Sequence, residues 1–148
     1  MLFIGTDHKG FALKESLNKY LLTKKIPFTD LGNFKLDTED DYPVAAALVA
    51  EQVKKGKNNL GILLCGSGVG VSIAANKFKG IRAGLVWNPK VAQAAKADDN
   101  INIICLPADY ISKNEAQKII DIWLKTSFKK EKKYKRRLSE IEQMEKFK

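Results

Sequence analysis

The chain has 148 residues, a formal net charge of +9, 45% hydrophobic residues and 29% charged residues. This composition is ordinary for one globular domain, and no segment approaches the roughly 20 consecutive apolar residues that a membrane-spanning helix needs. Two cysteines and one histidine are too few for a disulfide scaffold or for a zinc site made of protein ligands. The N-terminus enters a strand-like run without the basic segment and cleavage site of a signal peptide. We therefore expect one cytoplasmic domain over residues 1–148.

Short apolar runs alternate with amphipathic stretches along most of the chain. In chain order, the apolar runs of strand length are LFIGT (2–6), PFTDLG (27–32), LGILLC (60–65), IRAGLVW (81–87) and INIICL (101–106). The helices predicted between and after them cover residues 10–25, 43–56, 71–78, 89–97 and 112–125. Strands that alternate with helices, and that are apolar throughout, are typical of a parallel sheet covered on both faces. We therefore predict a three-layer α/β fold with a five-stranded parallel sheet.

Local signals mark the ends of two of these helices. Pro43 suits the first turn of the second helix, because its missing N–H has no intrahelical partner there, and Gly56 suits the end of that helix. Ser112 and Glu115 fit a capping box, in which each side chain accepts a hydrogen bond from the backbone of the other residue. These signals predict helix starts at residue 43 and directly after residue 112.

The C-terminal tail carries most of the net positive charge. Residues 125–148 hold ten Lys or Arg residues and four Glu residues, a net charge of +6. We predict a helix over residues 129–147 that projects from the domain or packs on a partner. Three explanations of its charge are open: a solvated helix face, capture of a phosphate group, or nucleic-acid binding. Tyr134 is the only aromatic residue in the basic run 129–137, which disfavours single-stranded nucleic acid.

Ligands of such sheets bind beyond the carboxyl ends of the strands, and the third predicted strand ends at Cys65. GSGVG (66–70) follows it, and three glycines in five residues allow a tight turn whose N–H groups can bind an anion. The same positive field favours a thiolate at Cys65, which could take a proton from carbon beside an anion-binding loop. The alternative is a buried structural cysteine before a turn that requires positive φ angles.

Other polar positions have two interpretations each. His8, the only histidine, either completes a helix N-terminus or contacts a phosphate or sugar hydroxyl at the sheet edge. Asp98, Asp99 and Asn100 form a polar group before the fifth strand, where the ordinary role is a solvated turn. Cys105 lies inside that strand and is predicted to belong to the core.

Segments along nearly the whole chain carry a family resemblance. They are GTDHKGFALK at the start, LGNF, DYP (41–43), GILLCGSGVGVSIAANKFKGIRA (61–83), NINII and RRLSEIE. In these segments the chain resembles the ribose-5-phosphate isomerase B family, which also contains the galactose-6-phosphate isomerase subunits. The resemblance implies a Rossmann-like five-stranded parallel sheet and interconversion of aldose and ketose phosphates through an enediolate. It also implies that no metal or cofactor is needed, and that the active sites of at least a dimer borrow groups from the neighbouring subunit.

The resemblance also assigns roles to residues. Cys65 corresponds to the family's cysteine base, and residues 66–70 correspond to its enediolate-binding loop, with the Ser67 hydroxyl where Thr or Ser is usual. The catalytic residues implied are Cys65, Ser67 and Asp98. The substrate-binding residues implied are Asp7, His8, Gly66, Gly68, Val69, Gly70, Asp99, Lys133 and Arg137, with Arg136 in place of Arg137 if the tail alignment shifts by one. The tail and the Asp98 region are expected to reach the active site of the neighbouring subunit.

The chain departs from the family pattern at four positions. Asp98 stands where a ring-opening histidine is common, and Asp99 stands where an Asn follows it. Asp109 replaces a binding arginine after the fifth strand, and Lys133 replaces the first tail arginine. Asp98 could still move the ring-opening proton if its neighbours raised its pKa. Added carboxylates are unfavourable near a phosphorylated substrate, so these changes put the identity of the sugar in question.

We expect an aldose–ketose isomerase that acts on ribose 5-phosphate as a homodimer or homotetramer. One alternative is an isomerase for a different aldose phosphate, such as a hexose 6-phosphate. Another is a catalytically weak paralogue that binds a sugar phosphate. Nucleic acid is not expected as a partner, because the charges of the tail have an explanation at the phosphate site, and neither is a membrane.

Overall fold

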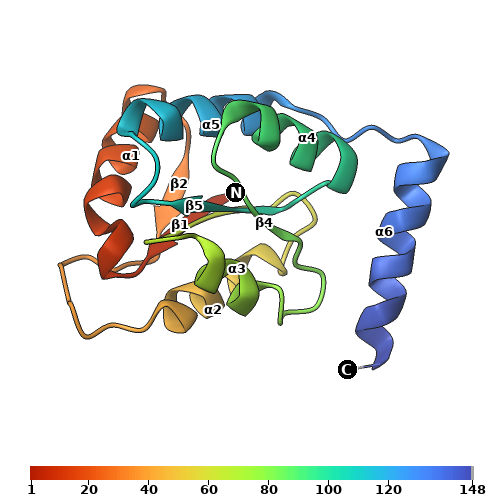
Figure 1. Ribbon diagram of the computed structural model, residues 1–148, viewed down its shortest axis with the longest axis horizontal. Helices are drawn as coiled ribbons and strands as arrows, with labels where there is room; N and C mark the ends of the chain where they lie inside the picture. The colour runs from red at the N-terminus through yellow and green to blue at the C-terminus, as the bar shows by residue number, and fades with distance from the viewer. Residues whose placement is uncertain (148) are drawn as a thin grey trace.

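A computed structural model describes residues 1–147, which contain one five-stranded sheet (Figure 1). Its strands are β1 (Leu2–Thr6), β2 (Phe28–Asp30), β3 (Leu60–Cys65), β4 (Ala83–Leu85) and β5 (Ile103–Pro107). They lie in the order β2-β1-β3-β5-β4, and every neighbouring pair is parallel. The predicted parallel α/β fold is confirmed. Lys148, the last residue of the predicted basic tail, lies outside the described residues.

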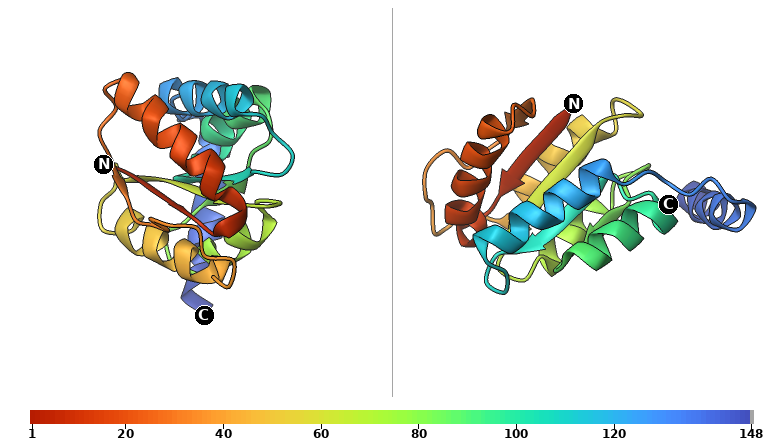
Figure 2. Two further views of the ribbon diagram at one scale, coloured as in Figure 1. Left: turned by 90° about the vertical axis from the view of Figure 1, so that its left-hand side faces the viewer. Right: turned by 90° about the horizontal axis from the view of Figure 1, so that it is seen from above.

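Helices cover both faces of the sheet. The α-helices are α1 (Phe11–Thr23), α2 (Tyr42–Val53), α3 (Val69–Ala75), α4 (Pro89–Asp99), α5 (Lys113–Lys125) and α6 (Lys132–Met144), and the 3-10 helices are η1 (His8–Gly10) and η2 (Glu145–Phe147). Helices α1, α4 and α5 lie on one face, and α2 and α3 lie on the other (Figures 1 and 2). No helix within residues 1–147 is long and apolar enough to cross a membrane.

Alternate residues of the central strands fill two separate cores. Ile62 and Leu64 of β3 pack with Trp123 of α5 on the face covered by α1, α4 and α5. Leu63 of β3 packs with Val49 of α2 on the opposite face. Because successive side chains of a strand point to opposite faces, a sheet covered on both sides requires apolar residues at every position. This requirement explains the uninterrupted apolar runs in the sequence.

The edge strands are shorter than predicted. β2 has three residues instead of the six of the run 27–32, because it pairs only with β1 and the chain then turns at Gly32, whose φ is +109°. β4 has three residues instead of the seven of the run 81–87, because it pairs only with β5. An apolar run therefore overestimates the length of a strand that has a partner on one side only.

Helix α3 begins at Val69, two residues before the predicted start at residue 71. Gly68 is its N-cap with a φ of +73°, so Val69 and Gly70 form the first helical turn although they were predicted to belong to the loop. The helix ends early because the side-chain amide of Asn76 binds the backbone N–H and C=O of Ala83, at 2.9 and 2.8 Å. These bonds tie the end of α3 to β4.

The helix-start signals are confirmed. In the capping box of α5, the Ser112 hydroxyl accepts from the Glu115 N–H at 3.2 Å and the Glu115 carboxylate accepts from the Ser112 N–H at 2.7 Å. Pro43 lies in the first turn of α2. Helix α2 ends at Val53, three residues before Gly56, so the predicted end is wrong.

Helix α6 projects away from the sheet and its covering helices (Figure 1). It begins at Lys132, three residues later than predicted. Tyr134 is the one buried residue of α6, and the carboxylate of Glu145, directly after the helix, accepts from the Gly80 N–H at 2.8 Å. Ile141 and Met144 are exposed. The expected projecting tail helix is therefore present within the described residues.

Candidate active site

The carboxyl ends of the central strands meet at one edge of the sheet. β1 ends at Thr6, β3 ends at Cys65 and β5 ends at Pro107, and Cys65 lies directly opposite Pro107 in the strand register. Asp7 and His8 follow β1 at the same edge. The structure therefore brings together Cys65, the loop after it and the Asp-His pair, which are far apart in the sequence.

The sulfur of Cys65 faces the turn that follows it. The Gly68 N–H donates to Sγ at 3.1 Å, and the side chain is 4% exposed. The turn and the start of α3 therefore lie directly beside the sulfur. Cys105 differs, because it is fully buried within β5 and its burial raises the pKa of the thiol. Its predicted core role is confirmed.

The loop after Cys65 is closely packed on its neighbours. A Cβ at Gly66 would lie 2.7 Å from Oδ2 of Asp109, and a Cβ at Gly70 would lie 2.8 Å from the ring of Tyr42. Ser67 is exposed at the tip of the loop, where its hydroxyl accepts from the Val69 N–H at 3.3 Å. Glycine at these two positions allows other side chains to approach the loop backbone.

Asp7 completes the N-terminus of η1. Its Oδ1 accepts from the backbone N–H groups of Lys9 and Gly10 at 2.9 and 3.2 Å. The side chain is 5% exposed, and burial raises the pKa of its carboxyl although both backbone N–H groups oppose that shift. The helix-terminus role considered for His8 therefore belongs to Asp7. Substrate binding by Asp7 stays a prediction.

The imidazole of His8 pairs with a carboxylate from another loop. Nδ1 of His8 lies 2.6 Å from Oδ1 of Asp40, which precedes α2. This contact raises the pKa of His8, with smaller contributions from Asp7 and from the longer-range charge of Asp40. The sequence analysis missed Asp40. It lies 32 residues from His8 in a polar loop, and no local pattern distinguishes it from the acidic residues beside it.

Asp98, Asp99, Lys133 and Arg137 do not lie at the Cys65 edge of their own chain. Helix α4 follows β4 and runs back toward the amino ends of the strands, so Asp98 and Asp99 at its end lie at the opposite edge. Lys129 donates to Oδ1 of Asp98 at 2.9 Å, which lowers the pKa of Asp98. Within one chain, the condition stated for proton transfer by Asp98, a raised pKa, is therefore not met, and its catalytic role stays a prediction.

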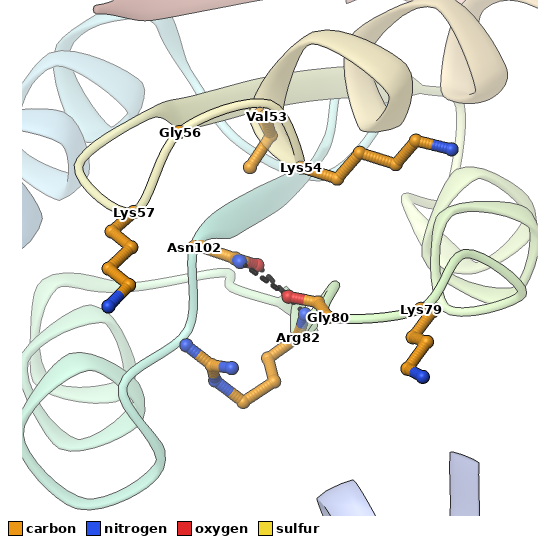
Figure 3. Close-up of a pocket in the computed structure, with 8 residues that line it drawn as sticks. All are labelled: Val53, Lys54, Gly56, Lys57, Lys79, Gly80, Arg82 and Asn102. Carbon is orange, nitrogen blue, oxygen red and sulfur yellow. Dashed lines mark hydrogen bonds between the residues drawn. The ribbon is translucent and has the colours of Figure 1, made fainter. Parts of the chain in front are cut away.

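A basic pocket of about 230 Å³ also lies at the amino ends of the strands (Figure 3). Lys57, Lys79 and Arg82 are among the side chains around it. Asn102 bridges its floor, because its amide donates to the Gly80 carbonyl and accepts from the Arg82 N–H, both at 2.8 Å. Arg82 Nε donates to the carbonyl of Asn100 at 3.0 Å. These bonds join the loops before β4 and β5, and the pocket is separated from Cys65 by the length of β3.

Comparison with known proteins identifies the family. Residues 2–141 match the family described as Ribose/Galactose Isomerase. The chain belongs to this family. It is 44% identical over 146 residues to the probable ribose-5-phosphate isomerase B of Mycoplasma genitalium, covering 98% of this chain and 95% of that one. It is 38% identical over 125 residues to the D-erythrulose-4-phosphate isomerase of Pectobacterium atrosepticum, covering 84% and 82%.

The fold agrees with that of the family. The crystal structure of the Mycoplasma genitalium ribose-5-phosphate isomerase B with bound ribulose-5-phosphate superposes with a TM-score of 0.94, covering 98% of this chain and 95% of that chain. The chain is therefore a sugar-phosphate isomerase of this family by sequence and fold. Within residues 1–147, no group of three or more His, Cys, Asp and Glu residues is placed to hold a metal ion.

Proposed function

We propose that this protein interconverts ribose 5-phosphate and ribulose 5-phosphate in the cytoplasm, with Cys65 as the base. The observation that carries the proposal is the position of Cys65, whose sulfur ends a central strand and accepts a hydrogen bond from the Gly68 N–H at 3.1 Å. A second support is the name of the relative from Mycoplasma genitalium, whose crystal structure contains ribulose-5-phosphate.

In the proposed reaction, the thiolate of Cys65 takes the proton from C2 of the open-chain aldose. The electron pair of that C–H bond forms the C1–C2 double bond, and the carbonyl electrons move to the C1 oxygen to give the enediolate. Partial positive charge from the loop 66–70 and the hydroxyl of Ser67 stabilise this oxygen. The thiol then returns the proton to C1, while the C2 hydroxyl loses its proton and becomes the ketose carbonyl and the C1 oxygen gains a proton and becomes a hydroxyl. No atoms are gained or lost, which is consistent with a reaction that needs no cofactor.

The location of the other predicted residues supports a site shared between copies of the chain. Lys133 and Arg137 are exposed on α6, beyond the edge of the sheet opposite Cys65. If these cations bind the substrate phosphate, a second copy must bring them to the Cys65 edge. We therefore include a homodimer, or a homotetramer built from such dimers, in the proposed function.

The first test is steady-state conversion of ribose 5-phosphate by wild type, Cys65→Ala and Cys105→Ala, with EDTA present. General-base catalysis contributes about 100- to 10,000-fold, so we expect Cys65→Ala to lose at least about 100-fold in kcat. Cys105→Ala changes a cysteine of the neighbouring strand and is expected to retain activity. Equal activity of Cys65→Ala and wild type would remove the cysteine mechanism. Inactive, folded wild type would remove the proposed substrate.

A different aldose phosphate is the second candidate substrate. Oδ2 of Asp109 lies close to Gly66. A carboxylate beside the loop repels a substrate phosphate that is placed there. A relative that is 38% identical, compared with 44% for the relative from Mycoplasma genitalium, is named for D-erythrulose-4-phosphate. A panel of tetrose, pentose and hexose phosphates distinguishes the two candidates by kcat/KM. Ribose 5-phosphate as the best substrate would exclude the second candidate, and binding of every sugar without turnover would indicate a weak paralogue.

A further inference from the structure

His8 is held on two sides by one oxygen of Asp40. Its backbone N–H donates to Oδ1 of Asp40 at 3.0 Å, and its Nδ1 lies 2.6 Å from the same oxygen. Two contacts to one acceptor fix both the backbone position and the direction of the ring. The side chains are 28% exposed for His8 and 13% exposed for Asp40, so the pair is half-buried at the surface of the carboxyl edge.

The carboxylate of Asp40 is held in place in turn. Its second oxygen, Oδ2, accepts from the side-chain amide of Asn33. Asn33 follows Gly32, whose carbonyl accepts from the Thr6 N–H at 3.1 Å and whose N–H donates to Oδ1 of Asp30 at 2.8 Å. The loop that carries Asn33 and Asp40 is therefore bound to the ends of β1 and β2. The carboxylate of Asp40 is therefore a fixed acceptor, and it determines the orientation of the His8 ring.

This arrangement leaves one nitrogen of the ring for a ligand. Nδ1 faces Asp40, and within the described residues 1–147 no hydrogen-bond partner occupies Nε2. The charged groups that act on the ring are Asp40 and Asp7, which favour its protonated form, and Lys9, which disfavours it. A fixed imidazolium with a free Nε2–H is a directional donor for an anionic oxygen.

We propose that Asp40 is the positioning residue of His8: its carboxylate holds Nδ1–H inward, so that Nε2–H is presented to the phosphate of the sugar-phosphate substrate. This inference rests on the proposed function for the identity of the ligand only. The orientation of the ring is a property of the free protein and is tested without turnover. Asp40 lies outside every segment on which the family resemblance depends.

Because His8 is the only histidine, its imidazole signals in ¹H–¹⁵N NMR spectra need no assignment by mutation. In wild type we expect a titration midpoint above the ordinary value of about 6.5 and a neutral form that carries its proton on Nδ1. Asp40→Asn keeps an oxygen acceptor but removes the charge, so the midpoint falls while the tautomer is kept. Asp40→Ala removes both, so the tautomer preference is lost as well. Glu39→Gln, an exposed neighbouring carboxylate, should behave as wild type.

The binding experiment titrates inorganic phosphate against the His8 signals at a pH below the wild-type midpoint, where Nε2 carries a proton, and then measures KM and kcat for ribose 5-phosphate. We expect phosphate to shift the wild-type signals, and Asp40→Ala to raise KM about tenfold while kcat changes less than threefold. Unchanged midpoint and tautomer in Asp40→Ala would overturn the positioning role. Changed NMR properties with unchanged phosphate binding and KM would overturn the presentation of Nε2 to phosphate. Inactive wild type with the expected NMR changes would refute the substrate and support Asp40.

Discussion

Gly68 meets two constraints that a residue with a side chain does not meet. Its φ of +73° lies in the left-handed region, which costs L-residues about 1–2 kcal/mol. A Cβ there would also lie 2.5 Å from Cδ1 of Leu85 and 3.2 Å from the backbone between Leu106 and Pro107. The turn that brings the Gly68 N–H to the sulfur of Cys65 requires both this positive φ and this close packing.

Gly68→Ala should therefore lower the free energy of unfolding by about 3 kcal/mol, because strain at positive φ adds to overpacking. The matched control is Gly80→Ala, since Gly80 has a φ of +79° but nothing within 4 Å of its Cβ position. We expect a loss of about 1 kcal/mol there. Urea denaturation of both variants provides the comparison. Equal losses would show that φ alone matters and that the packing around Gly68 yields without cost.

For single residues, the sequence predicts position and role where the residue belongs to one continuous motif. Cys65 and its loop could be located because three glycines follow a buried strand within five residues, and Cys105 could be assigned to the core because it lies inside an apolar run. Asp40 could not be found, because its partner His8 is 32 residues away and only the fold joins them. The lowered pKa of Asp98 could not be foreseen either, because Lys129, which follows α5 in the chain, is 31 residues away from Asp98 in the sequence.

Helix α1 is attached to the edge strand β2 by a buried ion pair. The side chain of Lys14 is fully buried, and its Nζ donates to Oδ2 of Asp30 at 2.5 Å and to the exposed Oε1 of Glu15 at 3.1 Å. The amide of Asn18 donates to the same oxygen of Asp30 at 2.6 Å. The same ammonium group lies 5.9 Å from the ring centre of Phe34. The ammonium group of Lys14 therefore contacts residues of three elements, which are α1, β2 and the loop after β2.

Lys14→Met should lower the free energy of unfolding by about 3 kcal/mol, because it leaves Asp30 without its cation in a partly buried position. Lys19→Met on the same helix is the control, since Lys19 is exposed and its replacement should change stability by no more than about 0.5 kcal/mol. Urea denaturation measures both. If the two variants are equally stable, the ion pair of Lys14 adds nothing beyond the burial of its methylene groups.

Element types were predictable from the sequence, and element ends were less so. The capping box at Ser112 predicted the start of α5 because it is a local chemical signal that the structure uses without change. The start of α3 was placed two residues late because Val69 and Gly70 continue the Gly-rich pattern, while the structure turns already at Gly68. The length of β4 was overestimated because an apolar run records burial, and Ile81 and Val86 on either side of β4 are buried without belonging to the strand, whereas β2 ends where the chain turns at Gly32.

On the scale of the whole molecule, the predicted site residues divide between opposite edges of the sheet. Cys65, His8 and the loop 66–70 lie at the carboxyl edge, whereas Asp98 and the cations of α6 lie at the other. The sequence could not reveal this division, because it follows from the direction of α4 and from the projection of α6. If both groups bind the substrate, as we propose, one chain carries the two halves of the site at opposite edges, and a complete site requires two chains to associate.

Removal of residues 129–148 tests this division. Within residues 1–147, the contacts of the tail with the rest of the chain include the bonds of Lys129 with Asp98 and Ala97, the bond from Gly80 to Glu145, and the packing of buried Tyr134. We expect the shortened chain to fold, with a Tm lowered by less than about 5 °C. We also expect light scattering to show a monomer and kcat/KM to fall at least about 100-fold, because two charge-assisted contacts to phosphate are lost.

The full-length double variant Lys133→Ala/Arg137→Ala separates the two effects of that truncation. It removes the cations that we assign to phosphate but keeps the apolar residues of α6, including Ile141 and Met144, which are exposed in the single chain. We expect it to remain oligomeric and to lose activity through KM. If the truncated chain retains activity as a monomer, each chain completes its own site. If the double variant is fully active, the phosphate is bound elsewhere, and His8, held by Asp40, is then a cationic group at the Cys65 edge that can bind it.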